Sequence, residues 1–147
     1  MAFFEKHLYL KKSKLPGAGK GLFTRVDIPK GERIVEYKGR LQPWKDVKDE
    51  DGYNSYLFKL SSRWAINGLT YKKAFGRYAN DARGLVRVEG LLNNAEYETE
   101  GKRCYLDASR NIKKGEEIFV EYGGNFWSLV KKMQREKEVK SKIKSKK

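Results

Sequence analysis

The stretch EEIFVEYGGNFW, residues 116–127, ends an apolar, strand-like run on Tyr122 and breaks it with two glycines. Two large rings, Phe126 and Trp127, follow at once. One interpretation is a core strand followed by a turn and the start of a helix. The other is that the Tyr122 hydroxyl stands at the mouth of a site and the rings fold over whatever binds there. The glycines would let the chain leave the strand abruptly.

A second tyrosine stands in a similar sequence context. DIPKGERIVEYKG, residues 27–39, and NIKKGEEIFVEYGG, residues 111–124, both carry a Lys-Gly turn, a glutamate, an apolar run and a terminal Glu-Tyr. The pattern puts Tyr37 and Tyr122 at equivalent ends of two strands. It is too short for a solenoid repeat, and two turn-then-strand units of the same chemistry would look alike without further relation.

The elements that must position these tyrosines are short strands. The chain of 147 residues fits one domain. Alternating or β-rich runs, punctuated by glycine and lysine-glycine turns, predict strands in HLYLKK, LFTRV, ERIVEY, YNSYLFKL, RWAING, AEYET, RCYLDAS and EIFVEY. A short helix is expected within TYKKAFGRYAND, and a long helical pattern appears only at the end. This organisation predicts a mainly β fold.

Charge and cysteine content bound the function. The formal net charge is +14, and residues 129–147 carry nine Lys and Arg against two Glu, or +7. We therefore expect a domain over 1–128 and a basic C-terminal helix or tail over 129–147. Cys104 and His7 are the only residues of their kinds, so no internal disulfide and no metal site is expected. No apolar run has membrane length, which predicts a soluble intracellular protein without membrane contact, nuclear in a eukaryote or cytoplasmic in a bacterium.

Three separated motifs together carry a family resemblance. GAGKGLF lies near the N-terminus, GRYANDARG lies past the middle, and EEIFVEYGG lies near the end. Their order and spacing over residues 11–127 resemble those of the SET-domain protein lysine methyltransferases. The resemblance implies a mainly β SET-domain fold of several small sheets, with a knot-like C-terminal crossing and a C-terminal helix. It also implies transfer of a methyl group from S-adenosyl-L-methionine to a protein lysine, by a stand-alone enzyme that lacks the zinc-binding cysteine flanks of its relatives.

The resemblance implies a role for each matching residue. Tyr122 and Tyr37 take the catalytic positions, and the substrate channel is formed by Tyr37, Tyr97 and Val120. The residues implied in binding the methyl donor are Ala18, Gly19, Lys20, Arg77, Tyr78, Asn80, Asp81, Tyr122 and Trp127. Arg77 has an equally good structural interpretation, and the glycine-rich stretch could be a turn with a solvated lysine. Val120 stands where relatives carry Phe or Tyr, so Tyr97 is expected to restrict the channel and favour monomethylation.

Two departures from the family pattern bear on the donor site. Asp81 stands where relatives have histidine, so the site works only if the aspartate or its backbone can replace that residue. The stretch ARGLVRVEGLLN, residues 82–93, is a long insertion in the loop that normally tucks under the final strand.

The chemistry agrees with the residue types present. A lysine amine attacks only when neutral, and keeping it neutral at about pH 7.4 costs roughly 4 kcal/mol against its free pKa of about 10.4. A narrow aromatic channel can supply much of this energy, because desolvation penalises the ammonium form.

Two classes of partner follow from the charge. A basic, lysine-containing protein segment is the expected substrate, with histones the first guess. The alternative is a catalytically weak or inactive SET-like module that binds nucleic acid or chromatin through its basic surface. The tail suits phosphate contact with DNA or nucleosomes in either case, and an active domain with such a tail combines both interpretations.

Overall fold

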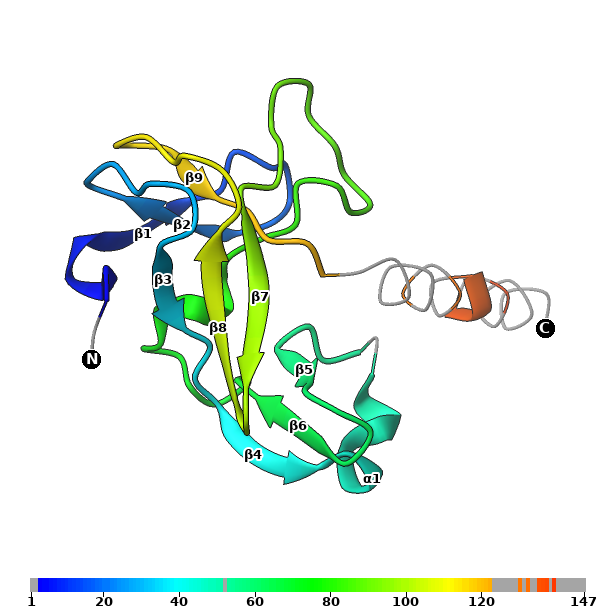
Figure 1. Cartoon of the computed structure of the whole chain (residues 1–147). Helices are drawn as coiled ribbons and strands as arrows, with labels where there is room; N and C mark the ends of the chain where they lie inside the picture. Colours follow the sequence, from blue (N-terminus) through cyan, green and yellow to red (C-terminus); the bar gives the residue numbers. More distant parts are fainter. Residues whose placement is uncertain are drawn as a thin grey trace.

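Three small antiparallel sheets make up the protein. The structure, a computed structural model, describes residues 3–51, 53–122, 130, 132, 135–137 and 139. Each sheet has three strands (Figure 1), in the orders β1-β2-β9, β3-β8-β7 and β4-β6-β5. The strands are β1 (Leu8–Lys12), β2 (Lys20–Thr24), β3 (Arg33–Glu36), β4 (Arg40–Pro43), β5 (Leu57–Lys59), β6 (Trp64–Asn67), β7 (Ala95–Glu100), β8 (Arg103–Ala108) and β9 (Glu117–Ile118). The predicted mainly β class is confirmed.

Helical segments of the described chain are short. They are η1 (Glu5–His7), α1 (Trp44–Val47), η2 (Lys48–Glu50) and η3 (Phe75–Tyr78), where η denotes a 3₁₀ turn. The helix expected within 70–81 is the single turn η3. Sequence patterns did not predict β4 and α1, because their exposed and half-buried residues follow neither a strand nor a helix period. Beyond Tyr122, the few described residues are helical.

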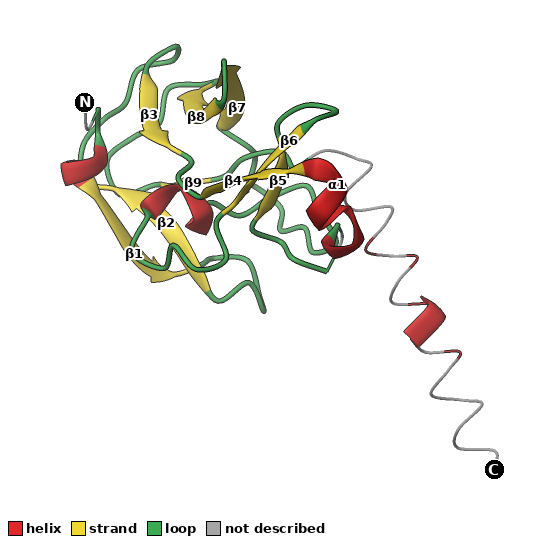
Figure 2. Ribbon diagram, turned by 90° about the horizontal axis from the view of Figure 1, so that it is seen from below, coloured by secondary structure: helices red, strands yellow, loops and turns green. Residues whose placement is uncertain are grey.

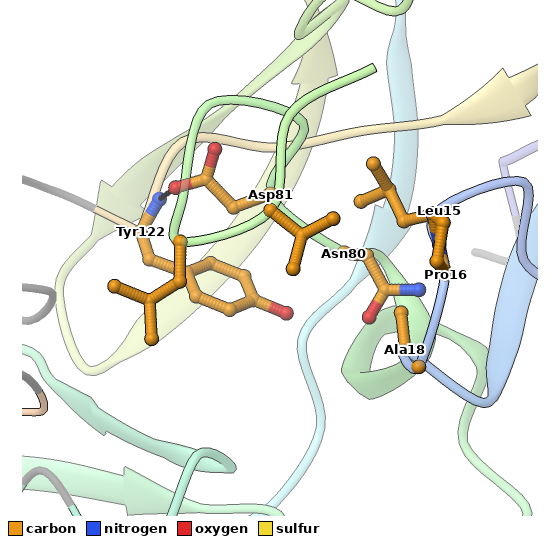
Figure 3. A pocket seen from close by; sticks show the side chains of 9 residues that line it. Leu15, Pro16, Ala18, Asn80, Asp81 and Tyr122 are labelled. Atoms are coloured by element: carbon orange, nitrogen blue, oxygen red, sulfur yellow. Dashed lines mark hydrogen bonds between the residues drawn. The ribbon is translucent and has the colours of Figure 1, made fainter. Parts of the chain in front are cut away.

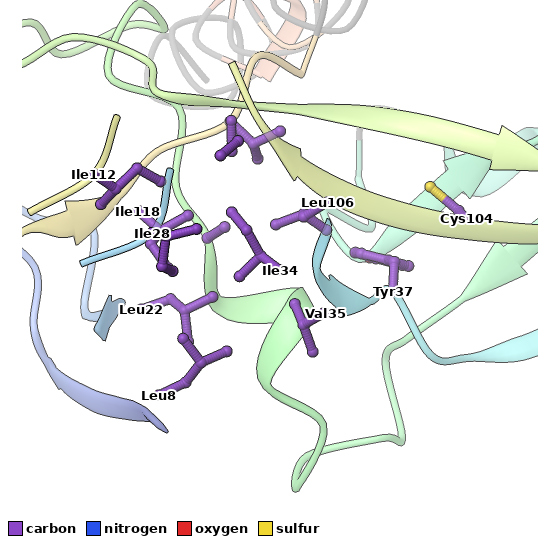
Figure 4. Close-up of a cluster of buried hydrophobic side chains, with 14 of the residues drawn as sticks. Leu8, Leu22, Ile28, Ile34, Val35, Tyr37, Cys104, Leu106, Ile112 and Ile118 are labelled. Atoms are coloured by element: carbon purple, nitrogen blue, oxygen red, sulfur yellow. The ribbon is translucent and has the colours of Figure 1, made fainter. Parts of the chain in front are cut away.

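The three sheets meet around one main core. Strands β1 and β2 lie at one side of the molecule and β4, β5 and β6 at the other, as Figures 1 and 2 both show. Between them, apolar side chains from several strands and turns are completely buried (Figure 4), among them Leu22, Ile28, Ile34, Leu106 and Ile118. Because the sheets are small, each relies on its neighbours to cover its apolar face.

The two similar sequence segments pair with each other at their turns. Ile28 and Ile112 exchange both backbone hydrogen bonds, at 2.7 and 2.8 Å. On either side, Asp27 accepts from the Lys114 N–H and Asn111 accepts from the Lys30 N–H, each at 2.8 Å. The turns are therefore joined reciprocally, and each leads into a strand that ends at one of the two tyrosines.

The end of the described domain passes between two earlier segments. Val120 donates its N–H to the carbonyl of Asn80, and the carbonyl of Phe119 accepts from the N–H groups of Asn94 and Ala95. The Asn94 side chain bonds to the same passing strand through the Glu117 carbonyl and the Phe119 N–H, both at 2.9 Å. The loop between Asn80 and Asn94 thus straddles the chain that delivers Tyr122, which is the crossing expected from the sequence.

Candidate functional site

A cavity of about 210 Å³ opens beside Tyr122, where four segments converge (Figure 3). The glycine-rich loop, the residues after η3, the inserted loop and the end of the final strand all contribute to it. Its lining residues are Leu15, Pro16, Gly17, Ala18, Asn80, Asp81, Leu85, Val86 and Tyr122. Segments distant in sequence therefore meet at a single concave site, as is usual for small-molecule sites.

A buried carboxylate holds the glycine-rich loop against the last strand. Glu117 is buried and accepts hydrogen bonds from the Ser13 hydroxyl at 2.6 Å and from the Lys14 N–H at 2.8 Å. The chain then turns through Gly17, whose φ of 77° favours glycine. Ala18 closes the turn by donating its N–H to Leu15 at 3.2 Å. The loop therefore reaches the cavity with its backbone ordered by hydrogen bonds.

The Asp81 side chain joins the inserted loop to the final strand. One carboxylate oxygen accepts from the Arg83 N–H at 2.8 Å and from the Asn93 amide at 2.9 Å. The other oxygen accepts from the Tyr122 N–H at 3.0 Å. Because a carboxylate accepts several bonds at once, Asp81 fixes both ends of the loop and the backbone of Tyr122 together.

Tyr122 and Asn80 present polar atoms to the cavity. The Tyr122 hydroxyl donates to the Ala79 carbonyl at 2.7 Å, and the Asn80 amide nitrogen donates to the Lys20 carbonyl at 3.1 Å. Figure 3 shows the Tyr122 hydroxyl and the Asn80 carboxamide pointing toward one another across the cavity. Within the described part of the chain, the Asn80 side-chain oxygen accepts no hydrogen bond.

A second group of aromatic rings packs, like Tyr122, in or against the main core. The Tyr37 hydroxyl donates to the Tyr56 carbonyl at 2.6 Å, and its ring meets that of Tyr97 edge-on with centroids 5.9 Å apart. Phe58 packs on Tyr97 with centroids 4.8 Å apart. We call Tyr37, Phe58 and Tyr97 the aromatic cluster.

Burial keeps the phenols of this region neutral. Loss of solvent raises the pKa of Tyr37, Tyr97 and Tyr122 above the usual value, because it penalises the phenolate. For both Tyr37 and Tyr97, the second cause of the raised pKa is the nearby Tyr122 phenol. Tyr122 is therefore shared: it lines the cavity and interacts with the aromatic cluster.

The residues singled out from sequence divide into two groups. Ala18, Asn80, Asp81 and Tyr122 line the cavity, and Tyr37 and Tyr97 form the aromatic cluster. Val120 is fully buried in the main core. Gly19, Lys20, Arg77 and Tyr78 are not among the residues that line the cavity. Trp127 lies outside the described residues, as does most of the 129–147 segment.

Arg77 has structural contacts of its own. Its guanidinium donates to the carbonyls of Gly68 at 2.8 Å and Leu69 at 2.7 Å, and it stacks 3.8 Å from the ring centroid of Tyr56. Tyr56 is the residue whose carbonyl receives the Tyr37 hydroxyl. These contacts favour the structural interpretation of Arg77, as a residue that supports the wall behind Tyr37.

Sequence reasoning missed the apolar residues of the cavity. Leu15 and Pro16 precede the glycines, and Leu85 and Val86 lie in the insertion. A signal was present, since the inserted loop carries several large apolar residues, Leu85, Val86, Val88, Leu91 and Leu92. Pattern alone could not show which surface they face.

The described residues include no candidate metal site and no candidate membrane-spanning helix. No group of three or more His, Cys, Asp or Glu side chains is placed to hold a metal ion in the part of the chain that the structure describes. Among the same residues, no helix combines the length and apolar character needed to cross a membrane.

Comparisons with known proteins identify relatives. A family model described as the SET domain matches residues 19–123. The chain is similar to a Chaetomium thermophilum protein named histone-lysine N-methyltransferase EZH2, 35% identical over 146 residues that cover 90% of this chain and 9% of the relative. It is also similar to Caenorhabditis elegans histone-lysine N-methyltransferase set-17, 31% identical over 118 residues, or 80% of this chain and 41% of the relative. The chain thus spans less than half the length of either relative.

Solved structures share the fold. A humanized mutant of the Chaetomium thermophilum Polycomb Repressive Complex 2, bound to an inhibitor, matches with a TM-score of 0.63 and 28% identity, over 84% of this chain and 16% of that chain. An active polycomb repressive complex 2 in the basal state matches with the same TM-score and 31% identity, over 80% of this chain and 15% of that chain. These similarities confirm the fold expected from the three motifs.

The Asp81 contacts predict a loss of stability on substitution. Asp81→Asn keeps the size of the side chain but replaces one carboxylate oxygen by an NH2 group. This group can donate but not accept, so it would face the N–H of Arg83 or of Tyr122 without a hydrogen bond. We expect the free energy of unfolding to fall by about 1–3 kcal/mol. Urea denaturation measures it, with the exposed Asp46→Asn as the matched control, expected to change stability by no more than about 0.5 kcal/mol. Equal, small effects of both substitutions would contradict the assigned role.

The raised phenol pKa values predict a loss of stability in alkali. Above about pH 10 the unfolded chain releases phenol protons that the folded chain retains, so the free energy of unfolding decreases as pH rises, by up to about 1.4 kcal/mol per pH unit for each phenol. Denaturation at a series of pH values should show a shallower decline for Tyr37→Phe than for the unsubstituted protein. Tyr53→Phe, at a ring that is 73% exposed, should leave the slope unchanged, and a Tyr37→Phe slope equal to it contradicts the prediction.

Proposed function

This chain belongs to the SET domain family, and from that premise we propose that it transfers a methyl group from S-adenosyl-L-methionine to a lysine side chain of a protein. The proposal extends to this chain an activity that the names of its relatives state for them. One observation carries it: Tyr122 lines the cavity and also packs against the main core, to which Tyr37 belongs and against which Phe58 and Tyr97 pack. A transfer between two substrates needs such a junction.

The cavity residues fit the methyl donor. The Asn80 side-chain oxygen, which accepts no hydrogen bond from the described residues, suits the amino group of the donor. The backbone around Ala18 and the ring of Tyr122 line the same cavity as Asn80. When bound, the donor supplies a methyl group on a positively charged sulfur. Ala18, Asn80, Asp81 and Tyr122 are thus the proposed donor-binding residues, whereas Gly19, Lys20 and Tyr78 would act through the shape of the surrounding loops.

The aromatic cluster suits a lysine that must lose its proton. Keeping the amine neutral at about pH 7.4 costs roughly 4 kcal/mol. Tyr37 is buried and Tyr97 and Phe58 are packed rings, so a side chain threaded among them would be stripped of water. Desolvation lowers the pKa of an amine, and the released proton passes to solvent before the amine is enclosed.

The phenols position the amine rather than remove its proton. Burial raises the pKa of Tyr37 and Tyr122, so both hydroxyls stay protonated at neutral pH and neither serves as a base. Each hydroxyl hydrogen is committed to a backbone carbonyl, of Tyr56 and Ala79 respectively. The remaining lone pair of the Tyr37 hydroxyl can accept a hydrogen bond from an incoming amine and orient it toward the cavity, which lowers the barrier by fixing the geometry of attack.

A basic protein segment is the proposed substrate. The relatives are named for methylation of histones, which are rich in lysine. We propose a histone or another DNA-associated protein as the class of substrate. Contact of the 129–147 segment with DNA remains a prediction from its charge.

Removing the Tyr122 hydroxyl tests the junction. Tyr122→Phe loses the group that joins the two sides, and we expect the rate of methyl transfer to fall by about 10- to 1,000-fold. The assay incubates the protein with radiolabelled S-adenosyl-L-methionine and a panel of histones and bulk cell protein. Tyr9→Phe, at a ring stacked on Phe23 away from the cavity, should keep full activity. No transfer by the unsubstituted protein, or full activity of Tyr122→Phe, would contradict the proposal.

The number of methyl groups added tests the role of Tyr97. We propose monomethylation as the main product, because the Tyr97 ring restricts the aromatic cluster while the small Val120 lies behind it in the core. Tyr97→Phe removes one oxygen and should shift the products toward dimethyl- and trimethyl-lysine, measured by mass spectrometry of the methylated peptide. An unchanged product distribution would contradict the role assigned to Tyr97 and would leave the proposed methyl transfer standing.

A further inference from the structure

The inserted loop places an apolar surface in the cavity. Leu85 and Val86 line it, yet they are 37% and 45% exposed, and they share the lining with Leu15 and Pro16 of the glycine-rich loop. A monomeric protein gains nothing by leaving two adjacent large apolar side chains in water beside a cavity. Such residues at a concave site point to a ligand that covers them.

The loop that carries these residues is fixed by its own contacts. At its base, Ala82 donates its N–H to the Asn93 side chain at 2.8 Å. Within it, the Arg87 guanidinium donates to the carbonyls of Gly84 at 3.3 Å and Arg83 at 3.0 Å, which folds the chain back on itself around Leu85 and Val86.

A small apolar cluster attaches the loop to the rest of the site. Val88 and Leu91 pack against a cluster formed by Leu15, Ala82 and Phe119. The loop and the glycine-rich segment are therefore parts of one packed unit. Leu85 and Val86 are held in place before any ligand arrives, so little ordering entropy is lost on binding.

The lining of the cavity combines two chemistries. Asn80 and Tyr122 offer polar atoms, whereas Leu15, Leu85 and Val86 offer only carbon. A ligand that fits both must combine a charged, hydrogen-bonding part with a flat apolar part. A lysine side chain lacks the flat apolar part, and the aromatic cluster already suits it. A nucleoside with an amino-acid extension has both parts.

We infer that the inserted loop, residues 83–92, forms the wall of the donor site that covers the adenine base, with Leu85 and Val86 as its contacts. This inference rests on the proposed function and adds to it residues that the family motifs do not contain. The loop then sets donor affinity through apolar burial against the purine face, and methyl transfer itself depends on Tyr122.

Binding of S-adenosylhomocysteine tests this inference without turnover. Isothermal titration calorimetry on the full chain should give a dissociation constant about 10- to 100-fold weaker for the double variant Leu85→Ser, Val86→Ser. Leu92→Ser is the matched control, because Leu92 lies in the same loop, is 45% exposed and does not line the cavity. Circular dichroism melts establish that each variant is folded.

The outcomes separate this inference from the proposed function. Wild-type binding with equal affinity in the double variant and in Leu92→Ser overturns the loop's role and leaves the methyl-transfer proposal standing. No binding by the wild-type protein sinks the proposed function itself. Should the double variant fail to fold, photolabelling of the wild-type protein with an 8-azidoadenine analogue decides: a crosslink within residues 83–92 supports the inference, and labelling confined to other segments overturns it.

Discussion

The buried carboxylate of Asp81 is the contact on which the geometry of the site depends. It accepts hydrogen bonds from the backbone of Arg83 and Tyr122 and from the Asn93 side chain, and so ties the inserted loop to the strand that passes beneath it. An unpaired buried carboxylate would be costly, and this one is compensated by three donors, two from the inserted loop and one from Tyr122. The Asp81 carboxylate thereby holds the inserted loop and Tyr122 in place.

The catalytic proposal follows from what this arrangement does to Tyr122. Its backbone is held by Asp81 and its hydroxyl by Ala79, so the ring has a fixed position at the cavity. Tyr37 is fixed in the same manner through Tyr56. Two neutral phenols held by hydrogen bonds in a desolvated site are the proposed means of orienting an amine.

The sequence was sufficient for the class of fold, and four of its candidate site residues, Ala18, Asn80, Asp81 and Tyr122, lie together at the cavity. Strand patterns and turn glycines are local signals, and the similarity of the segments around Ile28 and Ile112 correctly placed Tyr37 and Tyr122 at the ends of paired units. Contacts across the fold were not predictable. Arg77 donates to the Gly68 and Leu69 carbonyls and is not among the residues that line the cavity, and the presence of Leu85 at the cavity depends on how an inserted loop packs. Neither is encoded in a local pattern.

A crystal structure of the protein with bound S-adenosylhomocysteine tests the central claim most directly. The account predicts density for the ligand in the cavity between the glycine-rich loop and Asn80, with its sulfur facing the Tyr122 hydroxyl and its base against the inserted loop. A ligand bound elsewhere on the protein, or one whose sulfur is separated from Tyr122 by intervening side chains, would contradict it.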